Sequence, residues 1–108
     1  MKLSSDELER YDRQIRIKGI GESGQLKLKK ARVMVAGAGG LGCPASLYLA
    51  AAGVGYLAVV DKETAELSNL NRQVLHWSYD VGKLKCVSVA EKLHQLNPEV
   101  KIETISKV

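Results

Sequence analysis

Cysteine is scarce in this sequence. The 108 residues include only two cysteines, Cys43 and Cys86, which belong to no closely spaced pair. A disulfide framework and a four-ligand zinc site therefore cannot be built within the chain. We expect both thiols to be reduced, as they are in the cytoplasm.

The sequence also lacks a long, uninterrupted hydrophobic run. Its longest apolar stretch, residues 41–60, is interrupted by Pro44, Gly53 and Gly55 and contains the polar Ser46. This stretch predicts a helix, a turn and a strand instead of a membrane span. The first seven residues lack the apolar region and the cleavage site of a secretory signal. We therefore expect a cytoplasmic protein that makes no membrane contact.

A block of like charge is missing as well. The formal net charge is +4, and basic residues are mixed with acidic ones over residues 6–30. The densest basic cluster, within residues 27–32, is interpreted as a solvated helix end that the helix dipole favours. Nucleic acid is therefore not an expected partner. With 45% hydrophobic and 26% charged residues, the composition is that of one globular domain.

The first 31 residues predict a helical arm. Ser4 and Glu7 form a capping-box pattern, which indicates a short helix from Ser4 to about Gln14. A glycine-rich loop follows, and Ser23 is expected to cap a second short helix over residues 25–29.

After the arm, apolar runs predict alternating strands and helices. Residues 33–36, 56–60 and 100–105 are expected to be strands, the first of them buried on both faces. Residues 41–52 and 84–96 have helical spacing, whereas residues 62–80 show no long period. Glycine at position 53 and the pair Asn97-Pro98 are expected to end the two helices. The faces expected to point inward comprise Leu41, Ala45, Tyr48, Leu49 and Ala52 in the first helix and Cys86, Val89, Ala90, Leu93 and Leu96 in the second.

This order of elements predicts an α/β fold, the Rossmann-like βαβ(α)β half of a doubly wound parallel sheet. Residues 32–108 would form the nucleotide-binding half, and residues 1–31 would precede it as the arm. Because such a half usually continues into further strands, we expect the chain to be the N-terminal part of a single domain.

A glycine motif lies between the first expected strand and helix. Residues 37–42 read Gly-Ala-Gly-Gly-Leu-Gly and match the pattern G-x-G-x-x-G in the context that the pattern requires. Glycines allow a tight turn, and the free N–H groups at a helix start attract phosphate. We interpret Gly37, Gly39, Gly40 and Gly42 as nucleotide-binding; the alternative is a glycine-rich turn without a ligand.

Asp61 ends the second expected strand, about 20 residues after the glycine motif. An acidic side chain there can accept hydrogen bonds from ribose hydroxyls, which implies an adenine nucleotide. NAD and ATP present the same ribose, so these two features do not separate a dehydrogenase from an ATP-using enzyme. The structural alternative for Asp61 is a plain acid at a strand end.

Further elements accompany the glycine motif and Asp61 in a particular order. Residues 10–14 read Arg-Tyr-Asp-Arg-Gln, residues 66–73 read Glu-Leu-Ser-Asn-Leu-Asn-Arg-Gln, and residues 81–85 read Val-Gly-Lys-Leu-Lys. With this order the sequence resembles the adenylating core of the ubiquitin-activating-enzyme-like family, which includes the MoeB and ThiF proteins of molybdopterin and thiamine biosynthesis. Residues 68–73 are the most specific part, since many enzymes share a glycine loop.

The resemblance implies a role for each matching residue. Gly40 would contact the nucleotide and Asp61 its ribose. Arg13 would enter the site of a neighbouring subunit, which implies a homodimer. ATP with Mg²⁺ would be the cofactor. The residues implied to bind the phosphates, or to complete their site, are Ser68, Asn69, Arg72 and Lys85, of which Arg72 and Lys85, together with Arg13, would take part in catalysis.

The chemistry of adenylation agrees with this assignment. A carboxylate attacks the α-phosphate while pyrophosphate leaves, so two anions approach each other and their charge must be stabilised. Arg72 suits a forked phosphate contact, and Lys85 suits a point contact. The alternative for both is ordinary surface charge. Glu63 departs conservatively from the second Asp of many relatives. The resemblance places a magnesium-binding Asp, zinc-binding cysteine pairs and any catalytic cysteine after Val108.

Three functions remain open from the sequence. The leading hypothesis is the ATP-binding core of an adenylyltransferase that activates the C-terminal carboxylate of a small ubiquitin-like or sulfur-carrier protein. One alternative is an NAD-dependent Rossmann oxidoreductase, and another is a non-catalytic nucleotide-binding or dimerisation fragment. Cys43 is expected to pack under the glycine turn and Cys86 to lie in the core, and His76 and His94 are interpreted as structural or exposed.

Overall fold

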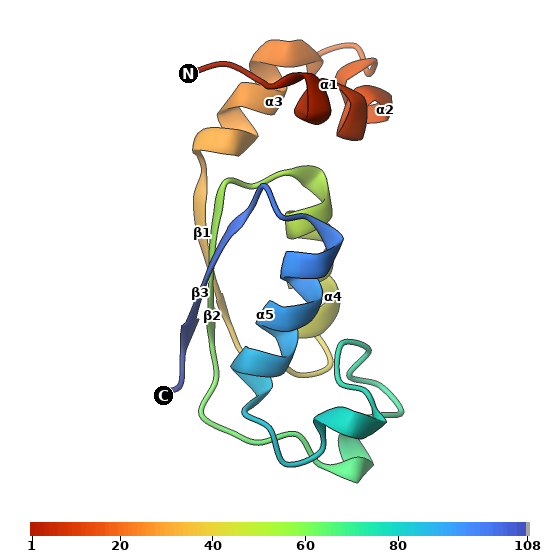
Figure 1. Ribbon diagram of the computed structural model, residues 1–108, viewed down its shortest axis with the longest axis vertical. Coiled ribbons are helices and arrows are strands. Elements are labelled where there is room, and N and C mark those ends of the chain that lie inside the picture. The colour runs from red at the N-terminus through yellow and green to blue at the C-terminus, as the bar shows by residue number, and fades with distance from the viewer. Residues whose placement is uncertain (108) are drawn as a thin grey trace.

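The computed structural model describes residues 1–107 of the chain and begins with a helical arm (Figure 1). The arm contains α1 (Ser5–Arg10), α2 (Asp12–Ile15) and α3 (Gly21–Lys30). The predicted capping box is present, because the Glu7 N–H donates to Ser4 Oγ over 3.1 Å and the Ser4 N–H donates to Glu7 Oε1 over 2.9 Å. Tyr11 separates α1 from α2, so the single helix predicted here is two short ones.

The start of α3 differs from the prediction. The helix begins at Gly21, and its N-cap is Ile20, whose side chain makes no capping bond. Ser23 therefore lies inside the first turn instead of capping it. The chain reaches the helix through Gly19 and Gly21, which both have positive φ, so the tight entry is made by backbone that glycine tolerates and not by a side-chain cap.

The rest of the chain forms a parallel sheet with helices on one face. The strands β1 (Arg32–Ala36), β2 (Tyr56–Val60) and β3 (Lys101–Ile105) lie in the order β1-β2-β3. The crossover helices α4 (Gly42–Ala52) and α5 (Lys85–Leu96) lie side by side against the same face (Figure 1). This confirms the predicted Rossmann-like arrangement. Val108, the last residue of the predicted nucleotide-binding half, lies outside the described residues.

A single apolar core lies between the sheet and the two helices. Central β2 is the best-buried strand, and Leu57 and Val59 are inaccessible to solvent. The remaining buried members of the core come mainly from α4 and α5 and comprise Ala38, Cys43, Ala50, Leu75, Cys86, Val89, Leu93 and Val100. Both cysteines are free and buried, as predicted. No helix within residues 1–107 is long and apolar enough to cross a membrane.

Two burial predictions were wrong. Strand β1 is not buried on both faces, because within the described chain it is an edge strand with helices on one side only, and Met34 is 65% exposed. Only part of the expected face of α4 points inward, because Leu41 is 88% and Tyr48 72% exposed, whereas Leu49 packs against the core. Cys43, Ser46 and Ala50 face the core instead. The helix is apolar all round, so its sequence gave no contrast between faces.

The arm is fastened to the sheet domain by buried polar side chains. Gln25 Nε2 donates to the Ala52 carbonyl over 2.9 Å, and Asn97 Nδ2 donates to Tyr11 Oη over 2.7 Å. Gly53 ends α4 with φ 96°, and a Cβ at this position would lie 2.5 Å from Gln25 Nε2. Glycine is therefore required both by conformation and by the close approach of the arm.

Candidate functional site

The predicted glycine loop, residues 37–42, connects the carboxyl end of β1 to α4. Gly37 has φ 111°, a conformation that residues with a Cβ rarely adopt. A Cβ on Gly42 would lie 1.9 Å from the Gly37 carbonyl oxygen, so the turn closes only with glycine at this position. Steric limits therefore require glycine at positions 37 and 42.

The backbone N–H groups at the tip of this loop are unused. Within residues 1–107, the N–H groups of Gly39, Gly40, Leu41 and Gly42 make no hydrogen bond. They precede or begin α4, a helix of 11 residues, where the helix dipole is positive. A row of free N–H donors at a helix start is a phosphate-binding arrangement.

Asp61 lies at the end of β2, beside the glycine loop. Its Oδ2 accepts a hydrogen bond from the Ala38 N–H over 2.8 Å, and its Oδ1 accepts one from the Glu63 N–H over 2.8 Å. Each carboxylate oxygen retains a further lone pair, so the side chain can also accept from ribose hydroxyls. The contact with Ala38 gives Asp61 a second role, in fixing the loop, that sequence reasoning missed.

Lys85 is the first residue of α5, and its side chain is buried. The residue is 6% exposed, and its Nζ makes no hydrogen bond or ion pair within residues 1–107. The charge of Lys85 acts on both Cys43 and His76, which in turn contact Ala38 of the glycine loop. The side chain is largely buried, but Nζ itself still reaches solvent. An ammonium that reaches solvent, acts on the side chains that contact Ala38 and has no paired acid within residues 1–107 is suited to binding an anion.

Gln73 is a second buried polar group without a complete set of partners. It is 5% exposed, and its Oε1 has no hydrogen-bond partner within the described residues. The carboxamide lies against the loop, since a Cβ on Gly39 would be 3.5 Å from Gln73 Nε2. Sequence reasoning included Gln73 in the motif of residues 68–73 but gave it no role. The structure places it in the site.

The remaining motif residues lie on the segment that follows Asp61, where η1 (Leu67–Asn69) forms a single turn. Asn69 is buried and its Oδ1 accepts from the Glu66 N–H over 2.8 Å, so it caps this turn. Arg72 is exposed, and its Nη1 donates to the Ser68 carbonyl over 3.0 Å. Within residues 1–107 no acid pairs with Arg72, which leaves its charge available to a ligand.

Arg13 is not brought to the glycine loop. It lies on α2 of the arm, at the opposite end of the molecule from the loop (Figure 1). Its side chain is 83% exposed and, among residues 1–107, pairs only with the neighbouring Asp12. The predicted entry of Arg13 into a phosphate site is therefore possible only between two copies of the chain.

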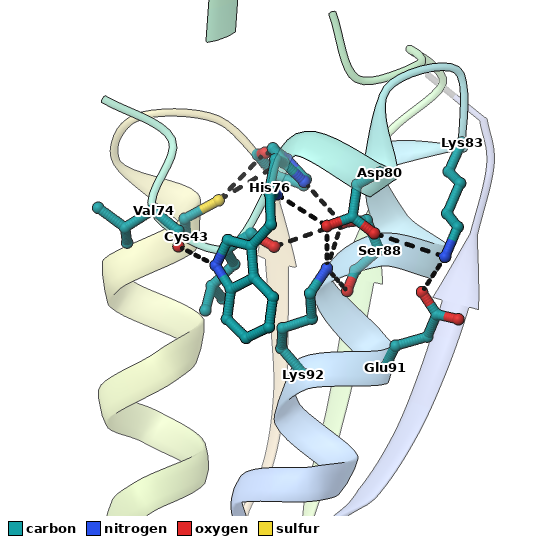
Figure 2. Close-up of polar contacts among 11 residues, drawn as sticks. Cys43, Val74, His76, Asp80, Lys83, Ser88, Glu91 and Lys92 are labelled. Atoms are coloured by element: carbon teal, nitrogen blue, oxygen red, sulfur yellow. Dashed lines mark hydrogen bonds and ion pairs between the residues drawn. The ribbon is translucent and has the colours of Figure 1, made fainter. Parts of the chain in front are cut away.

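A buried polar network supports the glycine loop from below (Figure 2). His76 bonds through Nε2 to the Ala38 carbonyl at 2.7 Å and through Nδ1 to Ser88 Oγ at 2.9 Å. Lys92 Nζ donates to Ser88 Oγ over 3.0 Å and pairs closely with Asp80. Asp80 belongs to η2 (Ser78–Asp80) and also accepts from the Trp77 N–H over 2.7 Å. The network ties the segment after η1 to α5.

Burial and neighbouring charge set the ionisation of these groups. Burial lowers the pKa of His76, and the nearby Lys85 and Lys92 lower it further. Burial alone would raise the pKa of Asp80, but the hydrogen bonds from Lys92 and the Trp77 N–H outweigh it and lower the pKa. Burial raises the pKa of the Cys43 thiol, so this cysteine is not an activated nucleophile. Within residues 1–107, no three His, Cys, Asp or Glu side chains gather to hold a metal ion.

Comparison with known proteins agrees with this geometry. Residues 11–107 match the ThiF family, and the chain therefore belongs to that family. It is 57% identical over 103 residues to the adenylyltransferase and sulfurtransferase MOCS3 of Anopheles gambiae, a match that covers 95% of this chain. The same match covers 23% of MOCS3, so the chain spans about a quarter of the length of this relative.

Solved structures of related proteins share the fold. The tRNA N6-threonylcarbamoyladenosine dehydratase TcdA of E. coli, in complex with ATP, is 28% identical with a TM-score of 0.92; the match covers 99% of this chain and 43% of TcdA. E. coli MccB, in complex with AMPCPP and MccA, is 34% identical with a TM-score of 0.83; it covers 92% of this chain and 31% of MccB. Both structures hold an adenine nucleotide or its analogue.

Proposed function

We propose that this chain binds ATP and supplies the ATP-binding core of an adenylyltransferase. The observation that carries the proposal is the row of free backbone N–H groups at the start of α4, together with Lys85, whose ammonium has no paired acid within residues 1–107. A triphosphate would satisfy both, because it accepts from the N–H groups and neutralises the ammonium. The relatives named adenylyltransferase and the ATP complex of TcdA support the same nucleotide.

Each site residue has a proposed role. The N–H groups of Gly39, Gly40 and Gly42 bind phosphate, and Gly37 shapes the turn. Asp61 accepts from the ribose hydroxyls, Lys85 binds the phosphates from the start of α5, and Arg72 adds a forked contact from the exposed segment. Ser68 and Asn69 hold that segment in place, through the Ser68 carbonyl and the Asn69 cap.

The proposed reaction is the activation of a carboxylate. The attacking carboxylate and the α-phosphate are both anions, and Lys85 and Arg72 would reduce their repulsion. We propose the C-terminal carboxylate of a ubiquitin-like or sulfur-carrier protein as the substrate, in a molybdopterin, thiamine or related sulfur-transfer pathway. The described residues offer no ligand set for Mg²⁺ of their own, and Asp61 already accepts two backbone N–H groups.

A homodimer is part of the proposal, because only a second copy could bring Arg13 to the glycine loop. The exposure of the Arg13 side chain and its distance from the loop in one chain support this arrangement. Light scattering at micromolar concentration tests it: we expect a dimer, and a monodisperse monomer would contradict the assignment. A cytoplasmic location fits the two free thiols.

The nucleotide itself is tested by calorimetric titration of the chain with ATP and with NAD. We expect ATP to bind more tightly than NAD. The positive charges of Lys85 and Arg72 attract the triphosphate of ATP more strongly than the less charged pyrophosphate bridge of NAD. Asp61→Ala should weaken ATP binding by about 1–3 kcal/mol through loss of charge-assisted ribose contacts. Tighter binding of NAD would favour the oxidoreductase alternative instead.

A further inference from the structure

Ala38, the second residue of the glycine loop, is held from both sides. Its N–H donates to Asp61 Oδ2 over 2.8 Å. Its carbonyl oxygen accepts from His76 Nε2 at 2.7 Å and is also 3.4 Å from Cys43 Sγ. Ala38 and Cys43 are inaccessible to solvent, and His76 is 2% exposed. The loop is therefore anchored to the core through one residue.

The direction of these hydrogen bonds determines the state of His76. A carbonyl oxygen only accepts, so Nε2 carries a proton. The lowered pKa of His76 keeps the ring neutral, and Nδ1 then accepts from the Ser88 hydroxyl at 2.9 Å. Lys92 donates to the oxygen of that hydroxyl over 3.0 Å. The Leu75 carbonyl, 3.3 Å from Ser88 Oγ, is the more distant acceptor for the same proton.

The anchored carbonyl fixes the direction of the next N–H group. A trans peptide is planar, so the N–H of Gly39 points opposite to the C=O of Ala38. Because that carbonyl bonds to the buried His76 ring, the Gly39 N–H points away from the core. It makes no hydrogen bond within residues 1–107.

We propose that His76 is a positioning residue of the nucleotide site, which sets the orientation of the Ala38–Gly39 peptide and aims the Gly39 N–H at a bound phosphate. The ligand named here rests on the proposed function, whereas the orientation of the peptide does not. A histidine that only filled space in the core would not need to donate a hydrogen bond to the backbone of the glycine loop. The Asp80–Lys92–Ser88 chain holds the ring so that Nε2 faces that acceptor.

The proposal is tested with three variants of the 108-residue chain. His76→Leu fills the space but cannot donate, and His76→Gln keeps a donor that can reach Ala38. Val89→Ala removes core contacts on α5 but keeps the His76 side chain that donates to Ala38, and is the control for lost stability. In the absence of nucleotide, NMR resonances of the Ala38 carbonyl carbon and the Gly39 amide nitrogen should change in His76→Leu. They should stay close to wild type in His76→Gln and in Val89→Ala.

Affinity for ATP provides the second measurement. We expect His76→Leu to bind ATP about tenfold more weakly, the size of one lost hydrogen bond to a charged group. His76→Gln and Val89→Ala should stay within about threefold of wild type. A wild-type chain that binds no ATP would overturn the proposed function, while the resonances of the free chain would still decide the orientation of the peptide.

The tautomer of His76 gives a test that needs no variant to fold. Nitrogen NMR of the wild-type ring should show a neutral imidazole with its proton on Nε2. A proton on Nδ1 would overturn the proposal, because Nε2 could then not donate to Ala38. Unchanged Gly39 and Ala38 resonances in His76→Leu would overturn it as well.

Discussion

At the scale of single residues, Lys85 is expected to contribute to nucleotide binding but not to the stability of the free chain. Its side chain is largely buried, and its ammonium reaches solvent without a partner within residues 1–107. An unpaired charge that reaches solvent contributes little to the stability of the free chain and is available to a bound anion. Lys92, on the same helix, is equally buried but pairs with Asp80. The two lysines should respond to substitution in opposite ways.

Lys85→Met is expected to weaken ATP binding and to leave the fold as stable as before, or more stable. Methionine has a similar length but no charge to desolvate. The loss in affinity should be about 1.5–3 kcal/mol, the range for hydrogen bonds to charged groups. Calorimetry with ATP and urea unfolding of the free chain measure the two effects.

Two matched variants complete this test. Lys62→Met removes an exposed lysine near the same edge of the sheet and should change neither quantity appreciably. Lys92→Met breaks the buried pair with Asp80 and should cost about 3–5 kcal/mol of stability. If Lys85→Met destabilised the free chain as much as Lys92→Met, Lys85 would be a structural residue and not a ligand for phosphate.

At the scale of elements, α5 carries two stripes along its buried side. Cys86, Val89 and Leu93 face the sheet, and a polar stripe one residue behind them faces the segment after η1. That stripe comprises Lys85, Ser88 and Lys92. The helix thus holds the core and the polar network at the same time, and its polar stripe makes the fold sensitive to acid.

The pH dependence of stability follows from the pKa of His76, which is lower in the folded chain than in the unfolded one. The unfolded ring takes up a proton near pH 6.5, so the contribution of His76 is complete above that pH and decreases as the pH falls toward the lower folded pKa. Lys85 and Lys92 disfavour the protonated ring, whereas Asp80 favours it. Asp80, whose own pKa is lowered, loses its contribution only below its ordinary value of about 3.9.

We therefore expect the urea midpoint of the wild type to decrease when the pH is lowered from about 7.5 to about 5.5, and to decrease by more than the midpoint of His76→Gln. Both pH values lie above the pKa of most carboxylates, which is about 4. His94→Gln, at an exposed position of α5, should keep the wild-type dependence. Equal slopes in wild type and His76→Gln would show that His76 is not buried in its neutral form.

The sequence predicted the order of elements well, because strands and helices here differ in period and are separated by glycine and by Asn97-Pro98. The capping box at Ser4, the αL glycine at position 53 and the buried β2 were all confirmed. Burial of α4 and β1 was not predictable from pattern, since α4 is apolar all round and β1 lies at an edge.

The site was predictable in part. The glycine loop and Asp61 could be predicted as site residues from the sequence, because the order of strand, glycines, helix and second strand places both at the same end of the sheet. The burial of Lys85 and the contact of His76 with Ala38 depend on how the segment of residues 62–84 folds back over α5. That segment has no period, so only its tertiary packing reveals these contacts. The polar stripe of α5, at positions 85, 88 and 92, was the signal that sequence reasoning overlooked.

At the scale of the whole molecule, the chain is elongated, with extents of 41 × 24 × 21 Å. The arm lies at one end, whereas the glycine loop lies at the far end of the sheet, next to the segment between β2 and α5 that forms the other end of the molecule (Figure 1). A nucleotide bound at the glycine loop should therefore leave the environment of most arm residues in the same chain unchanged. Only Arg13 is expected to respond there, and only through a second copy.

The most direct test of the central claim is an NMR titration of the isotope-labelled chain with ATP. The account predicts that the amide resonances of Gly39, Gly40 and Gly42 shift first, together with the side-chain signals of Asp61 and Lys85. Residues of α1 and α3 should not shift. Saturable changes confined to the arm, or no change at the glycine loop at ATP concentrations that saturate binding, would contradict the claim that this loop is the nucleotide site.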